Sequence, residues 1–166
     1  MLYELTRRAA AAVKNSSTRL LVNDRLDIAL AAGAHGVQLT SQSLPTRVVR
    51  DAAPPDFLVG VSTHSLEQAD AAKSGGADFI LFGPVFHTES KRGFGDPQGV
   101  SKLAQVASKL PGLPVIAIGG ITIGNVRQCF SNGAAGIAAI RLLAEPDTLA
   151  ATATEIRRVW HREHVD

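Results

Sequence analysis

Cysteine is almost missing from this sequence, since Cys129 is the single one among 166 residues. One cysteine excludes an intrachain disulfide and any metal site built from several thiolates, so a reducing compartment fits the composition. We interpret Cys129 as a packing thiol on a helix.

The sequence also lacks an excess of charge of one sign, because 17 basic and 15 acidic residues leave a formal net charge of +2. Such a balance, without a run of Lys or Arg, argues against nucleic acid and against an anionic membrane surface as partners. The stretch MLYELTRRAAAAVK has neither the order of a secretory signal nor the roughly eighteen uninterrupted apolar residues of a membrane span. We therefore expect a cytoplasmic protein whose partner is a small molecule.

Length and composition indicate one domain over residues 1–166, because the chain is large enough for a single buried core and short for two. Within it, short apolar runs that are typical of strands buried on both faces recur at a nearly constant interval. The predicted strands are Leu20–Asn23, Gly36–Leu39, Leu58–Ser62, Phe79–Phe82, Val115–Ile118 and Gly136–Ile140.

Amphipathic stretches separate these runs. Leu66–Lys73 and Val100–Leu110 carry apolar residues at spacings of three and four, as helices do. Glycines at Gly33, Gly75–Gly76 and Gly133 follow predicted helices, where a left-handed residue can end a helix. This alternation predicts a parallel α/β sheet. We favour a TIM (β/α)8 barrel, incomplete in this chain at about six βα units, over a doubly wound open sheet, because no glycine-rich turn follows the first strand.

In such barrels the chemistry lies at the carboxyl ends of the strands, so the polar residues there are the candidates. Asn23-Asp24 follows the first strand, and its simpler interpretation is a turn in which Asp24 caps the next helix. Ser62 and Thr63 have a similar interpretation as a cap. Gly119–Gly120 has two equally supported interpretations, a tight turn and a backbone site for phosphate.

The stretch FGPVFHTESKRGFG, residues 82–95, joins the end of a predicted strand to a polar loop. Thr88 and Ser90 supply hydroxyl donors, and Lys91 supplies a charge. Long loops in compact domains are often functional, and the glycines that follow the basic residues suit a mobile lid. The loop predicts a site for a phosphorylated ligand, with a solvated surface loop as the alternative.

Several segments together resemble one family. LLVNDRLDIALAAGAHGV, GVSTHS, FGPVFHTESK, PQGV and VIAIGGIT are similar to the successive motifs of thiamine phosphate synthase and of the related thiazole tautomerase, in order and at matching spacing. The resemblance implies a (β/α)8 barrel and a transferase of thiamine biosynthesis. In that reaction an aminopyrimidine diphosphate joins a thiazole phosphate, giving thiamine phosphate and pyrophosphate, with Mg²⁺ assisting the departure of pyrophosphate. Catalysis of this kind rests on charge stabilisation and positioning.

The resemblance also assigns roles to individual residues. Asn23 would contact the pyrimidine and Asp24 would ligate Mg²⁺, while Ser62 and Lys91 would be the catalytic residues that hold the pyrophosphate. The implied partners are the two small phosphorylated substrates, and a homo-oligomer is compatible with them. The thiazole phosphate would be bound by Thr88, Glu89, Ser90, Gly120, Ile140 and Arg141.

The chain departs from the family pattern at several positions. Ser43 stands where the synthase has an aspartate that supplies a second Mg²⁺ ligand, so weakened metal binding is expected. Arg141 replaces the usual serine near the thiazole phosphate, where it would either strengthen anion binding or block the site. The catalytic histidine of the tautomerase corresponds to Pro84, with His87 close by but displaced.

The first two strands of the family barrel, with a Gln-x-Arg-x-Lys motif that grips the diphosphate, have no counterpart in this sequence. We therefore expect an amino-terminally truncated form, shorter by about 40 residues, with open sheet edges that aggregate or pair with another chain. In this form the chain is expected to lack synthase turnover, because half of the diphosphate site is missing. Three functions stay open: the synthase, the thiazole tautomerase, and a non-catalytic precursor-binding or regulatory protein.

Overall fold

The computed structural model describes residues 1–88 and 96–164. These residues form a sheet of six strands in the order β1-β2-β3-β4-β5-β6, which is also their order along the chain. The strand pairs with a defined register are parallel. The strands are β1 (Leu21–Asn23), β2 (Gly36–Leu39), β3 (Leu58–Thr63), β4 (Phe79–Phe82), β5 (Val115–Ile118) and β6 (Gly136–Ala138).

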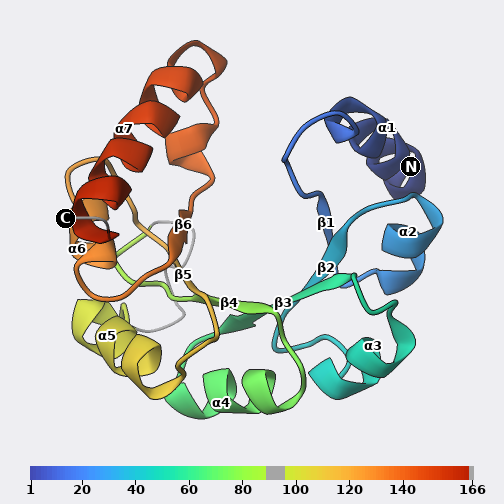
Figure 1. The fold of residues 1–166 in the computed structure, drawn as a ribbon, viewed down its shortest axis with the longest axis horizontal. Coiled ribbons are helices and arrows are strands. Elements are labelled where there is room, and N and C mark those ends of the chain that lie inside the picture. The colour runs from blue at the N-terminus through green and yellow to red at the C-terminus, as the bar shows by residue number, and fades with distance from the viewer. Residues whose placement is uncertain (89–95, 165–166) are drawn as a thin grey trace. The chain divides into compact units, whose positions relative to one another are not determined.

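Each strand is followed by a helical element (Figure 1), which confirms the α/β class and the count of six βα units. The predicted strand boundaries are close to the observed ones, but Ile140 lies outside β6 because the chain turns into a short 3₁₀ helix. No helix in the described part of the chain is long and apolar enough to cross a membrane. The helices are α1 (Leu2–Val13), α2 (Leu26–Ala31), α3 (Thr46–Ala52), α4 (Leu66–Ser74), α5 (Gly99–Lys109), α6 (Val126–Phe130), the 3₁₀ helix η2 (Arg141–Leu143) and α7 (Pro146–His164).

The chain divides into two compact units. The first unit contains Met1–Ser62 and Ala71–Phe79, and the second contains Thr63–Asp70 and Ile80–Asp166.

The core of the first unit is a row of valines across its strands. Val22, Val37 and Val59 are register partners on β1, β2 and β3, and all three are buried. Branched side chains suit strands that are covered on both faces. Helices α1 and α2 lie side by side and α2 packs on β1 and β2 (Figure 1), so these helices cover the first two strands.

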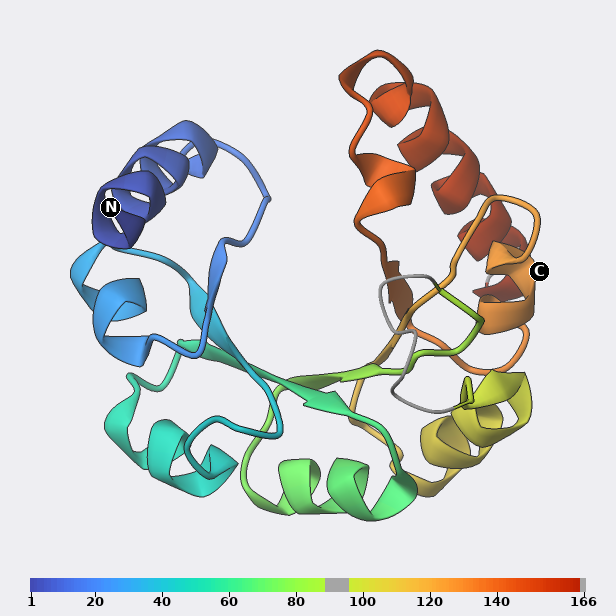
Figure 2. The same cartoon turned by 180° about the vertical axis from the view of Figure 1, so that it is seen from behind.

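The second unit has the same construction. Ile80 and Phe82 of β4 are register partners of Val115 and Ala117 of β5, and all four are buried. Helix α7 lies beside α6, as Figure 2 shows from behind. Cys129 of α6 is fully buried, and this burial raises the pKa of its thiol to about 11, which confirms the interpretation as a packing thiol.

A carboxylate joins a helix to a strand in the first unit. Oδ2 of Asp78 accepts hydrogen bonds from the backbone N–H of Val59 at 2.7 Å and from Nη2 of Arg50 at 3.1 Å. The same Arg50 nitrogen donates to the Phe57 carbonyl at 2.6 Å. The Asp78 side chain therefore fixes α3 against β3.

Replacing Asp78 by alanine is expected to lower the free energy of unfolding by about 1–3 kcal/mol, because the Val59 N–H and the Arg50 guanidinium lose a charged acceptor. Urea denaturation measures the change. The matched control is Asp51→Ala, since Asp51 pairs with Arg47 on the surface of α3 and exposed pairs contribute at most about 1 kcal/mol. Equal losses in the two variants would contradict the role given to Asp78.

Candidate functional site

The carboxyl ends of β1, β2 and β3 bring polar side chains together in the first unit. Asn23 of β1 is the register partner of Gln38 on β2, and Gln38 is the partner of Gly60 on β3. Asp24 follows directly, with its N–H donating to the Gln38 carbonyl at 3.0 Å. Ser62 lies two residues beyond Gly60, so it shares the same face of β3. Three of the predicted site residues, Asn23, Asp24 and Ser62, therefore belong to one cluster.

Asp24 has an uncommon backbone conformation. Its φ of 60° lies in the left-handed region, and it is the one non-glycine residue with positive φ in ranges 1–88 and 96–164. Such conformations concentrate at functional sites. The simpler interpretation of Asp24 as a helix cap is wrong, because Arg25 is the N-cap residue of α2 and no side chain caps that helix.

The Asp24 carboxylate faces two hydroxyl groups. Oδ1 accepts hydrogen bonds from Oγ of Ser43 and from Oγ1 of Thr40, the latter at 3.4 Å. Ser43 Oγ also accepts the Thr40 N–H at 2.7 Å, which folds the turn after β2 toward Asp24. Ser43 is thus beside Asp24, where a second carboxylate would share a bound cation.

The donor set around Asp24 sets what it can hold. It offers one carboxylate and two hydroxyl groups, and no described group of three or more His, Cys, Asp or Glu side chains could hold a metal. Mg²⁺ often binds through one or two carboxylates together with substrate phosphates and water. The residues therefore fit a Mg²⁺ that arrives with a diphosphate, and they do not fit a metal site that is complete by itself.

Gln38 is a functional candidate that the sequence reasoning did not select. Its side chain is only 9% exposed, and Nε2 donates to Ser62 Oγ at 3.1 Å. The signal available in the sequence was a lone amide inside the apolar run GVQL.

The predicted cap before α4 is provided by Ser65, whose Oγ accepts the Gln68 N–H at 3.2 Å, so Ser62 is not used as a cap.

A second cluster lies after β5 in the second unit. Gly119 and Gly120 have φ of 97° and 65°. A Cβ on Gly120 would lie 2.3 Å from the His87 carbonyl oxygen, so this backbone approaches the chain after β4 as only glycine can. No described residue accepts a hydrogen bond from the Gly120 N–H. This geometry favours a backbone anion site.

Asn125 holds this glycine turn in place. Its Nδ2 donates to the Gly120 carbonyl at 3.0 Å, while its Oδ1 accepts the Thr122 N–H at 2.8 Å. The sequence reasoning missed Asn125, although an amide five residues after a Gly-Gly pair could have suggested such a clamp.

Arg141 and Thr88 meet in the second unit. Arg141 Nη2 donates to Thr88 Oγ1 at 3.0 Å, so the cation and the hydroxyl predicted at the thiazole phosphate are in contact. Ile140 is 83% exposed and only its backbone suits the predicted role. Glu89, Ser90 and Lys91 lie outside the described residues.

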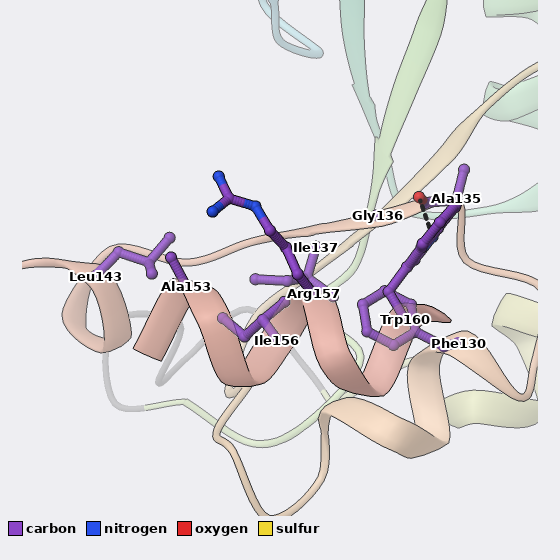
Figure 3. Close-up of a pocket in the computed structure, with 9 residues that line it drawn as sticks. All are labelled: Phe130, Ala135, Gly136, Ile137, Leu143, Ala153, Ile156, Arg157 and Trp160. Atoms are coloured by element: carbon purple, nitrogen blue, oxygen red, sulfur yellow. Dashed lines mark hydrogen bonds between the residues drawn. The ribbon is translucent and has the colours of Figure 1, made fainter. Parts of the chain in front are cut away.

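A pocket of 330 Å³ lies between β6 and α7 (Figure 3). Trp160 forms one wall, with Nε1 donating to the Ala135 carbonyl at 3.1 Å. Arg157 is the one charged side chain among its described lining residues, which include no carboxylate and no hydroxyl group. The described lining therefore offers no ligand for a metal, and Arg157 is its one group that could bind an anion.

Comparisons with known proteins point to one family. The family described as "Thiamine monophosphate synthase" matches residues 1–143. A putative thiamine-phosphate synthase of Geobacter sulfurreducens is 44% identical over 147 residues, which cover 88% of this chain and 68% of that protein. A thiamine-phosphate synthase of Methanoregula boonei is 40% identical over 151 residues, covering 90% and 69%.

A solved structure agrees with these relatives. The thiamine phosphate pyrophosphorylase of Pyrococcus furiosus superposes with a TM-score of 0.86 at 31% identity, covering 98% of this chain and 77% of that one. The six βα units thus match part of a (β/α)8 barrel of this kind. By the extent of the sequence match and the agreement of the fold, the chain belongs to the thiamine monophosphate synthase family.

Proposed function

Although the sequence has no counterpart of the Gln-x-Arg-x-Lys motif, we propose that this chain acts as a thiamine phosphate synthase, joining an aminopyrimidine diphosphate to a thiazole phosphate with release of pyrophosphate. The observation that carries the proposal is the cluster of Asn23, Asp24 and Ser62 at the carboxyl ends of β1 and β3, the two strands on either side of β2 in the first unit. The exposed carboxylate can hold Mg²⁺, while the amide and the hydroxyl group can pair with the pyrimidine and with a diphosphate oxygen.

The first cluster is assigned to the pyrimidine substrate. The Asn23 side chain has no hydrogen-bond partner among the described residues, so its amide can pair with the polar edge of a pyrimidine. Ser62 Oγ and, from the sequence, Lys91 hold the diphosphate. Asp24 holds Mg²⁺, which when bound neutralises the charge of the leaving pyrophosphate.

The second cluster is assigned to the thiazole phosphate. The Gly120 N–H, the Thr88 hydroxyl and the Arg141 guanidinium are the donors, joined in the sequence-based assignment by Glu89, Ser90 and the Ile140 backbone. Arginine binds phosphate oxygens through two parallel N–H groups, so Arg141 supplies more charge than the serine it replaces. Of the two expectations for Arg141, we propose the stronger anion binding.

The tautomerase alternative gains no support from the described residues. Pro84 stands at the position of its catalytic histidine and has no titratable group, while the His87 carbonyl is packed against Gly120. Mg²⁺ dependence of turnover separates the two activities, because the synthase releases pyrophosphate and the tautomerase releases none.

Replacing Ser43 by aspartate is expected to tighten Mg²⁺ binding in the presence of pyrophosphate by about tenfold, because a second carboxylate then lies beside Asp24. Isothermal titration calorimetry measures the affinity. Ser41→Asp is the matched control, since it adds the same charge in the same turn without the contact to Asp24. Equal affinities in Ser43→Asp and Ser41→Asp would contradict the metal position.

The two assignments can be tested separately by calorimetric titration of the whole chain. Pyrophosphate with Mg²⁺ is expected to bind more weakly in Ser62→Ala, while the affinity for thiazole phosphate stays unchanged. Arg141→Ala is expected to have the opposite pattern. A protein that binds neither ligand would overturn the proposed function.

A further inference from the structure

The hydrogen bond between Gln38 and Ser62 has a defined direction. Gln38 Nε2 lies 3.1 Å from Ser62 Oγ and 3.4 Å from the Leu39 carbonyl oxygen. A carbonyl oxygen can only accept, so the end of the amide between these two groups is the nitrogen. Ser62 Oγ is therefore the acceptor of this hydrogen bond.

The Gln38 side chain is also fixed in position. A Cβ on Gly60 would lie 2.3 Å from Gln38 Oε1 and 2.3 Å from Phe79 Cζ, so both side chains lie across the bare backbone of β3 at this glycine. Because Gln38 is almost fully buried there, its amide has little room to turn over.

The direction of this bond determines where the Ser62 proton points. A serine hydroxyl has one hydrogen to donate, and accepting from Gln38 leaves that hydrogen unused. No described residue accepts a hydrogen bond from Ser62 Oγ. Among residues 1–88 and 96–164 the Ser62 O–H therefore has no acceptor, and it lies at the carboxyl end of β3, on the strand next to Gln38 of β2.

We propose that Gln38 is a positioning residue, which holds the Ser62 hydroxyl so that its proton is donated to a diphosphate oxygen of the substrate. The inference rests on the proposed function, because it needs Ser62 to bind that diphosphate. Gln38 itself touches no reacting atom in this account. Its effect reaches the ligand only through Ser62.

A double-mutant cycle with inorganic pyrophosphate and Mg²⁺ as the probe tests this. Gln38→Met keeps the length of the side chain but removes the donor, and it is expected to weaken pyrophosphate binding by about fivefold to tenfold. In a Ser62→Ala background the same change is expected to weaken binding less than about twofold. A purely structural role of Gln38 would give the same loss in both backgrounds.

Two further variants give readouts that depend on the direction of the bond. Gln38→Glu makes Ser62 the donor to a carboxylate, so its proton no longer reaches the ligand, and binding is expected to fall by more than about tenfold. Gln38→His keeps an N–H donor and is expected to retain pyrophosphate binding better than Gln38→Met. If Gln38→Met does not fold, the pyrophosphate affinities of the other two variants decide. Tighter binding by Gln38→His than by Gln38→Glu supports the inference, and the reverse order overturns it.

The outcomes separate this inference from the function on which it rests. Absence of pyrophosphate binding by the unaltered chain, or equal binding by Ser62→Ala, would overturn the proposed role of Ser62 and the inference with it. Weaker binding by Ser62→Ala, combined with an equal loss for Gln38→Met in both backgrounds, would overturn the inference alone. Pyrophosphate binding by Gln38→Glu that equals binding by the unaltered chain would also overturn it.

Discussion

Replacing Asp24 by asparagine is expected to weaken Mg²⁺-dependent binding of pyrophosphate by about one hundredfold or more. Asp24 supplies the one carboxylate of the first cluster, and the hydroxyl groups of Ser43 and Thr40 cannot replace its charge. Asparagine keeps the shape of the side chain and tolerates the left-handed conformation, so the fold should be retained. Calorimetric titration with and without Mg²⁺ measures the loss.

Asp27 offers a matched control for this change. Its carboxylate pairs with Arg25 at 2.6 Å, and this hydrogen bond lowers the pKa of Asp27 to about 2, so it is a fully ionised neighbour of Asp24 outside the cluster. Asp27→Asn is expected to leave pyrophosphate binding unchanged within about twofold. The same loss in both variants would show that general negative charge near β1, and not a specific metal ligand, is responsible.

Replacing Gly120 by alanine is expected to have the second large effect. The backbone has φ of 65°, and the added methyl group would lie 2.3 Å from the His87 carbonyl oxygen. The turn must therefore move, which costs about 1–3 kcal/mol of stability and displaces the N–H offered to the thiazole phosphate. We expect at least about tenfold weaker binding of thiazole phosphate, with pyrophosphate affinity unchanged.

Gly124 provides the control for Gly120. It lies in the same connection after β5, its φ is not positive, and a methyl group there would be 3.8 Å from Thr122 Oγ1, an ordinary contact. Gly124→Ala should keep both stability and thiazole phosphate binding. Thermal melting and calorimetry of the two variants measure the difference, and a Gly120→Ala protein that binds normally would remove this turn from the phosphate site.

The strands were predictable because burial on both faces leaves a local signature. Runs such as VIAI of β5 and FILF of β4 are apolar throughout, and their boundaries match the structure. Ile140 was misplaced because an apolar residue gives no local sign that the chain leaves the sheet at Ala138 to begin η2. The identity of the residue does not tell whether an isoleucine is exposed or buried.

The site was predictable only in part, because some of its contacts join residues that are far apart in the sequence. Asp24 and Ser62 could be selected because polar residues after buried strands are conspicuous. The contacts between Gln38 and Ser62, and between Ser43 and Asp24, join residues 24 and 19 positions apart. Such pairs depend on the register of neighbouring strands and on the fold of a turn, which a single sequence does not specify.

The proposal of one domain over residues 1–166 and the roles of Lys91, Ser90 and Glu89 remain predictions from the sequence. Limited proteolysis tests the prediction of one domain. If the two units were separate domains, the protease would cut near their boundaries while each unit is still folded.

Turnover is the most direct test of the central claim, that this chain makes thiamine phosphate. The purified chain is incubated with aminopyrimidine diphosphate, thiazole phosphate and Mg²⁺, and thiamine phosphate and pyrophosphate are quantified by chromatography with mass spectrometry. We expect equal amounts of both products, dependence of turnover on Mg²⁺, and loss of product in Asp24→Asn. Binding of both substrates without any thiamine phosphate would contradict the claim and would identify a precursor-binding protein of the same family.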